Sequence, residues 1–135
     1  DPNGSKEGVL IDTIGPHIAA DVEGLTLYYA GETDGYLIAS SQGDNTYTIY
    51  SRGDVNNFIG RFSVVDSETI DGTSSTDGID VCNMNLGGRL SDGIFIVQDD
   101  VNDVGNQNFK IISWDEIASI FNPPLKINSG YDLRN

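Results

Sequence analysis

The chain has 135 residues, room for one domain, and its 7 Lys and Arg residues are outnumbered by 21 Asp and Glu, which gives a formal net charge of -14. This charge excludes nucleic acid and anionic membrane surfaces as expected partners, because both attract positively charged proteins. It favours bound cations, or a ligand reached through bound cations, and metal binding should then raise stability by mass action.

Short apolar or β-branched stretches separated by Gly- and Asp-rich turns follow one another along the chain. The expected strands are 9–14, 24–30, 36–41, 46–51, 58–65, 79–83, 94–98 and 109–113. Residues 114–121 (WDEIASIF) have apolar residues at helical spacing and acids in the first turn, which predicts one short helix. The pattern predicts an all-β sandwich, barrel or propeller with a short C-terminal helix.

An internal repeat chooses among these folds. DVEGLTLYY (21–29) parallels TDGIDVCNM (76–84), GYLIASSQGD (35–44) parallels GIFIVQDDVN (93–102), and NTYTIYSR (45–52) parallels QNFKIISW (107–114). A four-stranded unit that repeats at roughly 50 residues is typical of a propeller blade. The repeat therefore favours a propeller over the other two folds.

The expected division of the chain follows from the repeat. We expect the last strand of a preceding blade at 9–14, a full blade over 21–65, a partial last blade over 76–121, and a tail over 122–135. Fewer than two blades cannot close a ring, and each would leave an apolar face exposed. The remaining blades are therefore expected on a longer parent chain, on a cleaved partner or on copies of this chain.

Two loops are unusually acidic. DGTSSTDGID (71–80) holds three carboxylates in ten residues, and DDVNDVGNQN (99–108) follows the next strand. Closely spaced carboxylates repel one another unless a cation lies among them, and oxygen ligands on a flexible turn suit calcium. The alternative interpretation is a solvated acidic loop.

A third group of acids is expected where the inner strands begin. Asp21 and Glu23 are two residues apart on an extended segment, so both side chains can face one side. The repeat sets Asp77 at the equivalent place in the next blade. Inner strands of neighbouring blades begin at the same channel mouth, which favours a metal cluster over a solvated strand edge.

The repeat segments, together with DGTSSTDGIDV and GIFIVQDDVNDVGNQNFKIISWDEIA, resemble the carboxy-terminal part of the β-propeller phytases. These are calcium-dependent phosphohydrolases that act on phytate, inositol hexakisphosphate. The resemblance runs from about Asp1 to Phe121 and covers roughly the last third of such an enzyme. It implies a six-bladed propeller with its site at one end of the central channel, and a secreted or periplasmic location.

The resemblance also implies roles for particular residues. Asp21, Glu23 and Asp77 match ligands of active-site calcium ions, and Gln42 matches a polar residue beside the substrate phosphates. A tight structural calcium is implied at three matching residues: Asp71, Asn102 and Asp103. The family has Glu where this chain has Val101, and the loop is shorter here, so we expect a weaker site or one that uses Asp99 or Asp100. The family's remaining acids and phosphate-binding side chains come from earlier blades, outside this sequence.

The expected chemistry is direct in-line attack of a calcium-activated water on phosphorus, with the metal ions neutralising phosphate oxygens. The 135-residue chain alone is expected to be an incomplete piece of that enzyme. A second reading is a non-catalytic calcium-binding propeller fragment that mediates assembly.

Overall fold

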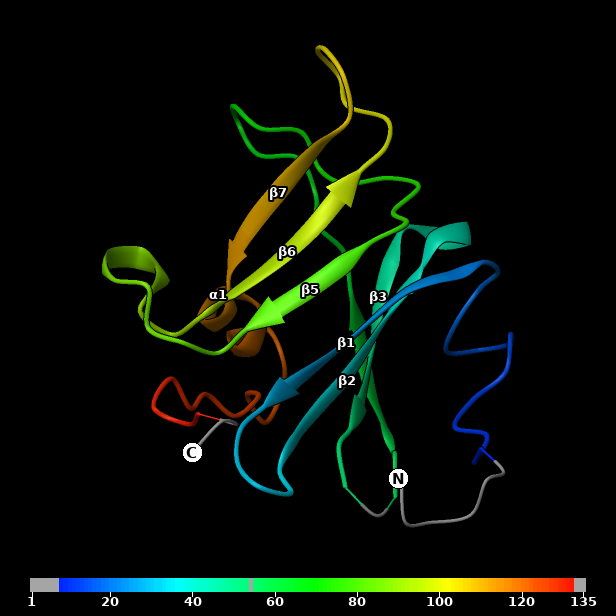
Figure 1. Ribbon diagram of the computed structural model, residues 1–135. Helices are drawn as coiled ribbons and strands as arrows, with labels where there is room; N and C mark the ends of the chain where they lie inside the picture. Colours follow the sequence, from blue (N-terminus) through cyan, green and yellow to red (C-terminus); the bar gives the residue numbers. More distant parts are fainter. Residues whose placement is uncertain (1–7, 54, 133–135) are drawn as a thin grey trace.

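The computed structural model describes residues 8–53 and 55–132, which form two antiparallel sheets and one short helix (Figure 1). In the first sheet, strands β1 (Val22–Tyr29), β2 (Gly35–Ser41), β3 (Thr46–Ser51) and β4 (Phe58–Phe62) lie in chain order. The second contains β5 (Ile79–Cys82), β6 (Ile94–Asp99) and β7 (Asn108–Ser113), also in chain order. The all-β prediction is confirmed. The propeller remains a prediction.

Short helical turns complete the elements. They are η1 (Gln42–Asp44) after β2, η2 (Gly88–Leu90) before β6, and the helix α1 (Trp114–Ser119) directly after β7. Within the described residues, no helix has both the length and the apolar character that a membrane span requires.

The two sheets meet at their first strands, β1 and β5, which lie side by side (Figure 1). Strand β1 alternates between the interior and the surface, with Gly24, Thr26 and Tyr28 buried and the leucines between them exposed. Strand β2 is buried along most of its length, because β1 and β3 pair with it on both edges. Each sheet is thus a simple meander, as the internal repeat predicts.

Aromatic side chains fill the space between the sheets. Tyr28 stacks on Trp114 at 4.2 Å between ring centroids. Tyr47, Phe62 and Phe95 form a second group with centroids 5.1 to 5.4 Å apart. Contacts at these distances add to the free energy gained by burying the rings. The core therefore joins side chains from both sheets and from α1.

The tail after α1 has no periodic pattern in the sequence, yet it is tied to the core. The backbone N–H of Lys126 donates to the Tyr36 hydroxyl at 2.7 Å, and that of Asn128 donates to the Tyr28 hydroxyl at 3.0 Å. Burial raises the pKa of Tyr28, so its hydroxyl stays neutral. The tail thus covers the tyrosine end of the core.

The expected strand at 9–14 is not formed. Residues 8–13 are irregular, and Val9 and Leu10 are 89% and 77% exposed. A strand needs a partner with free backbone groups, and the described residues place none beside this segment. The segment instead lies over the outer face of the first sheet and encloses an apolar groove with Val22, Leu25 and Leu37.

Other boundaries differ by a few residues. β1 begins at Val22 instead of residue 24, β4 ends at Phe62 instead of 65, and α1 ends at Ser119 instead of 121. Differences of this size are normal where element ends carry few hydrogen bonds.

Candidate functional site

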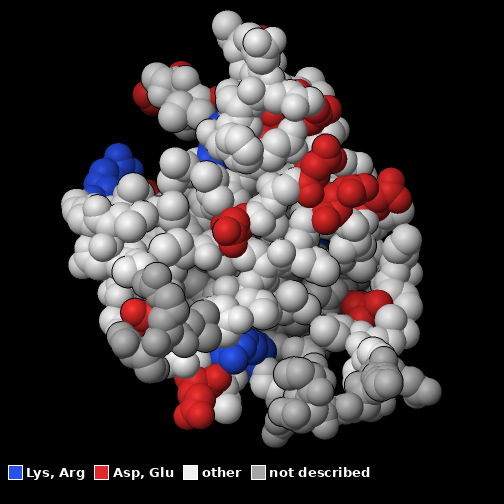
Figure 2. Space-filling model, in the orientation of Figure 1, with Lys and Arg blue, Asp and Glu red and all other residues white. Residues whose placement is uncertain are grey.

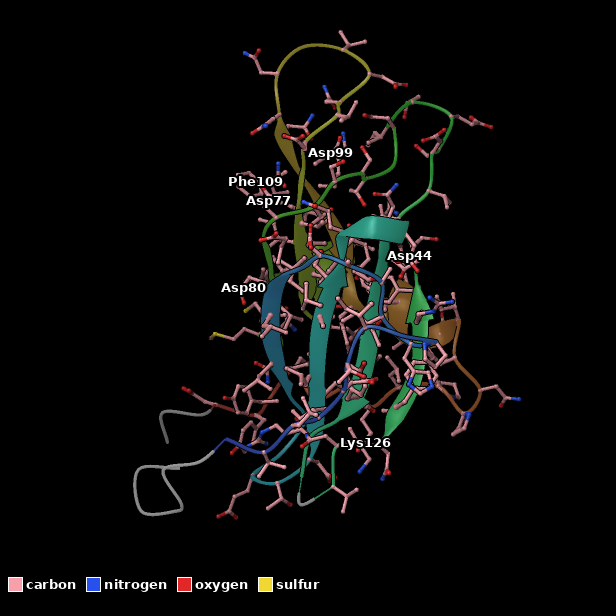
Figure 3. All side chains as sticks on the ribbon, turned by 90° about the vertical axis from the view of Figure 1, so that its right-hand side faces the viewer. Asp44, Asp77, Asp80, Asp99, Phe109 and Lys126 are labelled. Atoms are coloured by element: carbon pink, nitrogen blue, oxygen red, sulfur yellow. The ribbon has the colours of Figure 1, made fainter. Side chains whose placement is uncertain are left out.

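Acidic side chains gather at the end of the molecule where β1 begins, η1 lies and the chain enters β5 (Figure 2). Seen from the side, Asp44, Asp77 and Asp99 lie toward this same end, and Lys126 lies at the opposite one (Figure 3). Asp44, Asp77 and Asp99 thus place negative charge toward this end, which attracts cations.

Gln42 links two of the predicted site residues. Its side-chain Nε2 donates to Asp77 Oδ1 at 2.7 Å, and its backbone N–H donates to the carbonyl of Asp21 at 3.0 Å. One residue of η1 thus contacts the start of β1 and the turn before β5. The structure brings Asp21, Gln42 and Asp77 into one neighbourhood, although only Asp77 presents its side chain to Gln42.

The short turn η1 sits where it does because Gly43 has no side chain. A Cβ on Gly43 would lie 1.6 Å from the carbonyl oxygen of Ala20, far inside contact distance. Ser41 strengthens this contact, since its hydroxyl accepts from the backbone N–H of Ala19 at 2.8 Å and donates to Asp44 at 2.7 Å. The sequence SSQGD therefore locks Gln42 against the segment that carries Asp21.

A second glycine allows the two sheets to approach. A Cβ on Gly24 would lie 2.9 Å from the backbone nitrogen of Ile79. Two residues further along β1, the Thr26 hydroxyl donates to Asp80 Oδ1 at 2.7 Å. This close contact between β1 and β5 sets the two acidic strand starts next to each other.

The three predicted active-site acids remain open to solvent. Asp21, Glu23 and Asp77 are exposed, and the described part of the chain holds no group of three His, Cys, Asp or Glu placed to share a metal ion. Carboxylates repel one another at short range, so this open arrangement is the expected one on electrostatic grounds. The donor chemistry, carboxylate and amide oxygens, suits calcium. Their role as ligands remains a prediction.

The second predicted site is a compact cluster built around Lys110. Its ammonium lies 2.6 Å from Asp71 Oδ1 and 2.8 Å from Asn102 Oδ1, and it forms an ion pair with Asp99 Oδ2 at 3.3 Å. Asp99 is fully buried, and its Oδ2 has this ion pair but no hydrogen bond of good geometry. The oxygens expected around the tight calcium thus converge on a cation, and that cation is the side chain of Lys110.

Lys110 and its acidic partners each stabilise the charged form of the other. The hydrogen bond from Lys110 is the largest cause that lowers the pKa of Asp71, followed by the backbone N–H of Asp103. Burial works against the charge of Lys110, but the carboxylates of Asp71 and Asp99 outweigh it and raise the pKa of the ammonium. Both partners therefore stay charged near neutral pH.

Asp103 and Asp100 form contacts beside the Lys110 cluster, and their role as calcium ligands remains a prediction. Asp103 reaches Asp71 through its backbone N–H, at 3.0 Å, instead of adding a carboxylate. Asp100 accepts a hydrogen bond from the side chain of Gln107, and its backbone N–H donates to Ser74 at 3.1 Å. Sequence reasoning missed Lys110, whose only signal is that it is the sole basic residue of its strand.

The acidic loop 71–80 is tied to both sheets. The hydroxyl of Tyr47, on β3, is within 2.7 Å of the Thr73 hydroxyl and 2.8 Å of the Thr76 hydroxyl. Asp99, at the end of β6, accepts from the backbone N–H of Ser74 at 3.0 Å. Burial raises the pKa of Tyr47, so it remains a neutral hydrogen-bonding group. Thr73 and Thr76 are therefore fixed by buried contacts, while Asp77 and Asp80 of the same loop remain exposed.

His17 gains a partner that the sequence does not reveal. Its Nδ1 lies 3.1 Å from Asp12 Oδ2, which also accepts from the Tyr50 hydroxyl at 2.7 Å. The ring stacks on Phe58 at 3.9 Å. These contacts fasten the segment before β1 to the outer face of the first sheet.

Two meander sheets that meet at their first strands, with acidic loops at one end, define an all-β protein whose acidic end is the candidate site. The family model for Phytase matches residues 1–135, and the chain belongs to the phytase family. It is 50% identical over 123 residues to a protein named 3-phytase from Bacillus subtilis (strain 168). That match covers 87% of this chain and 32% of the relative, so the chain spans about a third of the relative's length.

Proposed function

We propose that this chain is part of a calcium-dependent phosphomonoesterase that acts on phytate. The observation that carries the proposal is the contact between Gln42 and Asp77, which joins the two sheets at the acidic end. Membership of the phytase family and the name of the Bacillus relative support the substrate and the reaction class.

In this proposal the three acids and Gln42 have different roles. Asp21, Glu23 and Asp77 would hold calcium, which, when bound, neutralises phosphate oxygens and lowers the pKa of a bound water for in-line attack. Gln42 has two amide hydrogens, of which one holds Asp77, and the other can donate to a phosphate oxygen. The acidic site then selects phytate through the cations, since bare carboxylates repel so anionic a substrate.

We further propose that the two sheets are neighbouring blades of a six-bladed propeller in a secreted or periplasmic enzyme. The first sheet has four strands and the second has three, so the second blade would be completed by a strand from outside the described residues. The other blades would supply the remaining acids and the basic side chains that bind phosphate.

The test measures phosphate release from calcium phytate by the complete protein, its Asp77→Asn variant and a Glu32→Gln control. Glu32 is an exposed acid in the turn after β1, away from the acidic end. We expect Asp77→Asn to lose at least about tenfold in rate, because a metal ligand is removed. Excess chelator should abolish activity and lower the melting temperature. Equal rates for both variants, or activity that survives chelation, would contradict the proposal.

The alternative is a non-catalytic calcium-binding propeller fragment that mediates assembly, and a structural role for the Lys110 cluster is consistent with it. There an ammonium already joins both acidic loops, which is a structural role. Phosphate release by the isolated chain separates the two readings. An inactive isolated chain together with an active complete protein would make this chain a piece of an enzyme, and inactivity of both would favour the module.

A further inference from the structure

One peptide unit at the acidic end is held from both sides. The carbonyl oxygen of Thr76 accepts a hydrogen bond from the Ser40 hydroxyl at 2.9 Å, and the N–H of Asp77 donates to Gln98 Oε1 at 2.9 Å. These two groups belong to the same trans peptide, so they point in opposite directions. The peptide that leads into Asp77 therefore cannot rotate without breaking one of two bonds.

The two holding side chains come from different sheets. Ser40 lies on β2 and is fully buried, and Gln98 lies on β6. They are also equivalent in the internal repeat, since each stands five residues after the glycine that begins its strand motif, Gly35 or Gly93. Residues at the same repeat position in the two sheets thus hydrogen-bond to one peptide that lies between the sheets.

Gln98 also contacts Gly78, the residue that follows Asp77. Its backbone N–H donates to the carbonyl of Gly78 at 2.9 Å, so its side chain and backbone contact the chain on both sides of Asp77. Gln42 then contacts the Asp77 carboxylate itself at 2.7 Å. Backbone and side chain of Asp77 are fixed by different residues, and none of these contacts uses a second carboxylate.

We propose that Ser40 and Gln98 are positioning residues, which orient the Thr76–Asp77 peptide so that the Asp77 carboxylate faces the cation at the channel mouth. This inference rests on the proposed function, in which Asp77 is a metal ligand. Residues that orient metal ligands from behind affect metal affinity by about 10- to 100-fold when they are lost. Neither residue touches the cation, so their effect passes through the position of Asp77.

Calcium titration by calorimetry of the complete protein tests this. Ser40→Ala removes the donor and Gln98→Met removes the acceptor at similar volume, and each should weaken calcium affinity by about tenfold or more. The matched control is Ser113→Ala, because the Ser113 hydroxyl also donates to a backbone carbonyl, that of Arg89, at 2.9 Å. The control should leave calcium affinity unchanged even where it lowers the melting temperature.

An Asp77→Asn background separates the inference from the proposed function. If Asp77 holds calcium, Asp77→Asn weakens binding, and adding Ser40→Ala or Gln98→Met should then change affinity little, since the residue they orient no longer binds. Weaker binding in Asp77→Asn with unchanged binding in Ser40→Ala and Gln98→Met would overturn the positioning role alone. Unchanged binding in Asp77→Asn would overturn the proposed function.

Discussion

Lys110, on β7, binds Asp71 of the first acidic loop: the lysine Nζ lies 2.6 Å from Asp71 Oδ1. Lys110 is 8% exposed, and the neighbouring Asp99 is fully buried. Charges in such surroundings are unfavourable unless each has a partner. The ammonium of Lys110 therefore stabilises the buried charge of Asp99 and the contact between the two loops.

Removal of this ammonium should destabilise the protein. Lys110→Met leaves Asp99 as a buried carboxylate without an ion-pair partner, and we expect the free energy of unfolding to fall by about 2 kcal/mol in urea denaturation. Lys126→Met is the matched control, because Lys126 and Asp34 form an ion pair with both side chains 61% exposed. Little change is expected there. Equal losses in both variants would contradict the buried role of Lys110.

The Tyr47 hydroxyl should contribute measurably to holding the acidic loop. Tyr47→Phe leaves the buried hydroxyls of Thr73 and Thr76 without their partner, which should cost about 1–2 kcal/mol of unfolding free energy. A cycle with Thr76→Val, measured by the same denaturation, should show that the two losses are not additive. If the losses in unfolding free energy were additive, the hydrogen bond between Tyr47 and Thr76 would not contribute to stability.

Two glycines at the acidic end should differ in their tolerance of alanine. Gly43→Ala places a Cβ against the Ala20 carbonyl at 1.6 Å, so η1 or the segment before Asp21 must move. We expect a loss of about 2 kcal/mol from this overpacking. Gly78→Ala meets no atom within 4 Å and should stay within about 0.5 kcal/mol of wild type. Thermal or urea unfolding of the two variants measures these losses. A Gly43→Ala variant as stable as wild type would contradict the close contact with Ala20.

Asp12 should make the protein sensitive to acid. The hydrogen bond from Tyr50 is the main cause that lowers the pKa of Asp12 below its ordinary 3.8, with further help from the Thr13 N–H and His17. A carboxyl whose pKa is lowered by folding stabilises the folded state above its ordinary pKa, and this contribution is lost as pH falls through the folded pKa.

The measurement is urea unfolding between pH 6 and pH 3. Asp12→Asn should be less stable than wild type at pH 6, and the difference should shrink toward and below the ordinary pKa of 3.8. Glu32→Gln, in an exposed turn, is the control and should follow the wild-type profile. A constant difference across the range would show that Asp12 acts through packing alone.

The sequence predicted the sheets well because their signals are local. Alternation in β1 and the turn residues around β2 and β3 depend on neighbours within a few positions. The prediction of a strand at 9–14 was wrong because strand pairing depends on a partner that is distant in the sequence. Apolar composition alone does not supply such a partner. The repeat predicted that the acids at 21, 23 and 77 would be neighbours. The structure shows Gln42 in contact with Asp77 and with the backbone of Asp21, and the three-acid cluster remains a prediction.

Long-range polar contacts could not be read from the sequence. Lys110 sits on a strand where a basic residue usually faces solvent, yet it is buried by acids 39 and 11 residues away. Ser40 and Gln98 occupy equivalent repeat positions, but only the packing of two sheets shows that both reach one peptide. Such contacts leave no periodic pattern.

The tail after α1 reaches the tyrosines of the core through backbone amides of Lys126 and Asn128, not through side chains. These two hydrogen bonds to the tyrosines do not depend on which side chain stands at 126 or 128, although the Asn128 side chain separately donates to the carbonyl of Ala30 at 2.8 Å. Proline, which has no amide hydrogen, would uncouple the tail there. Proline at either position is therefore the substitution that we least expect to find among relatives.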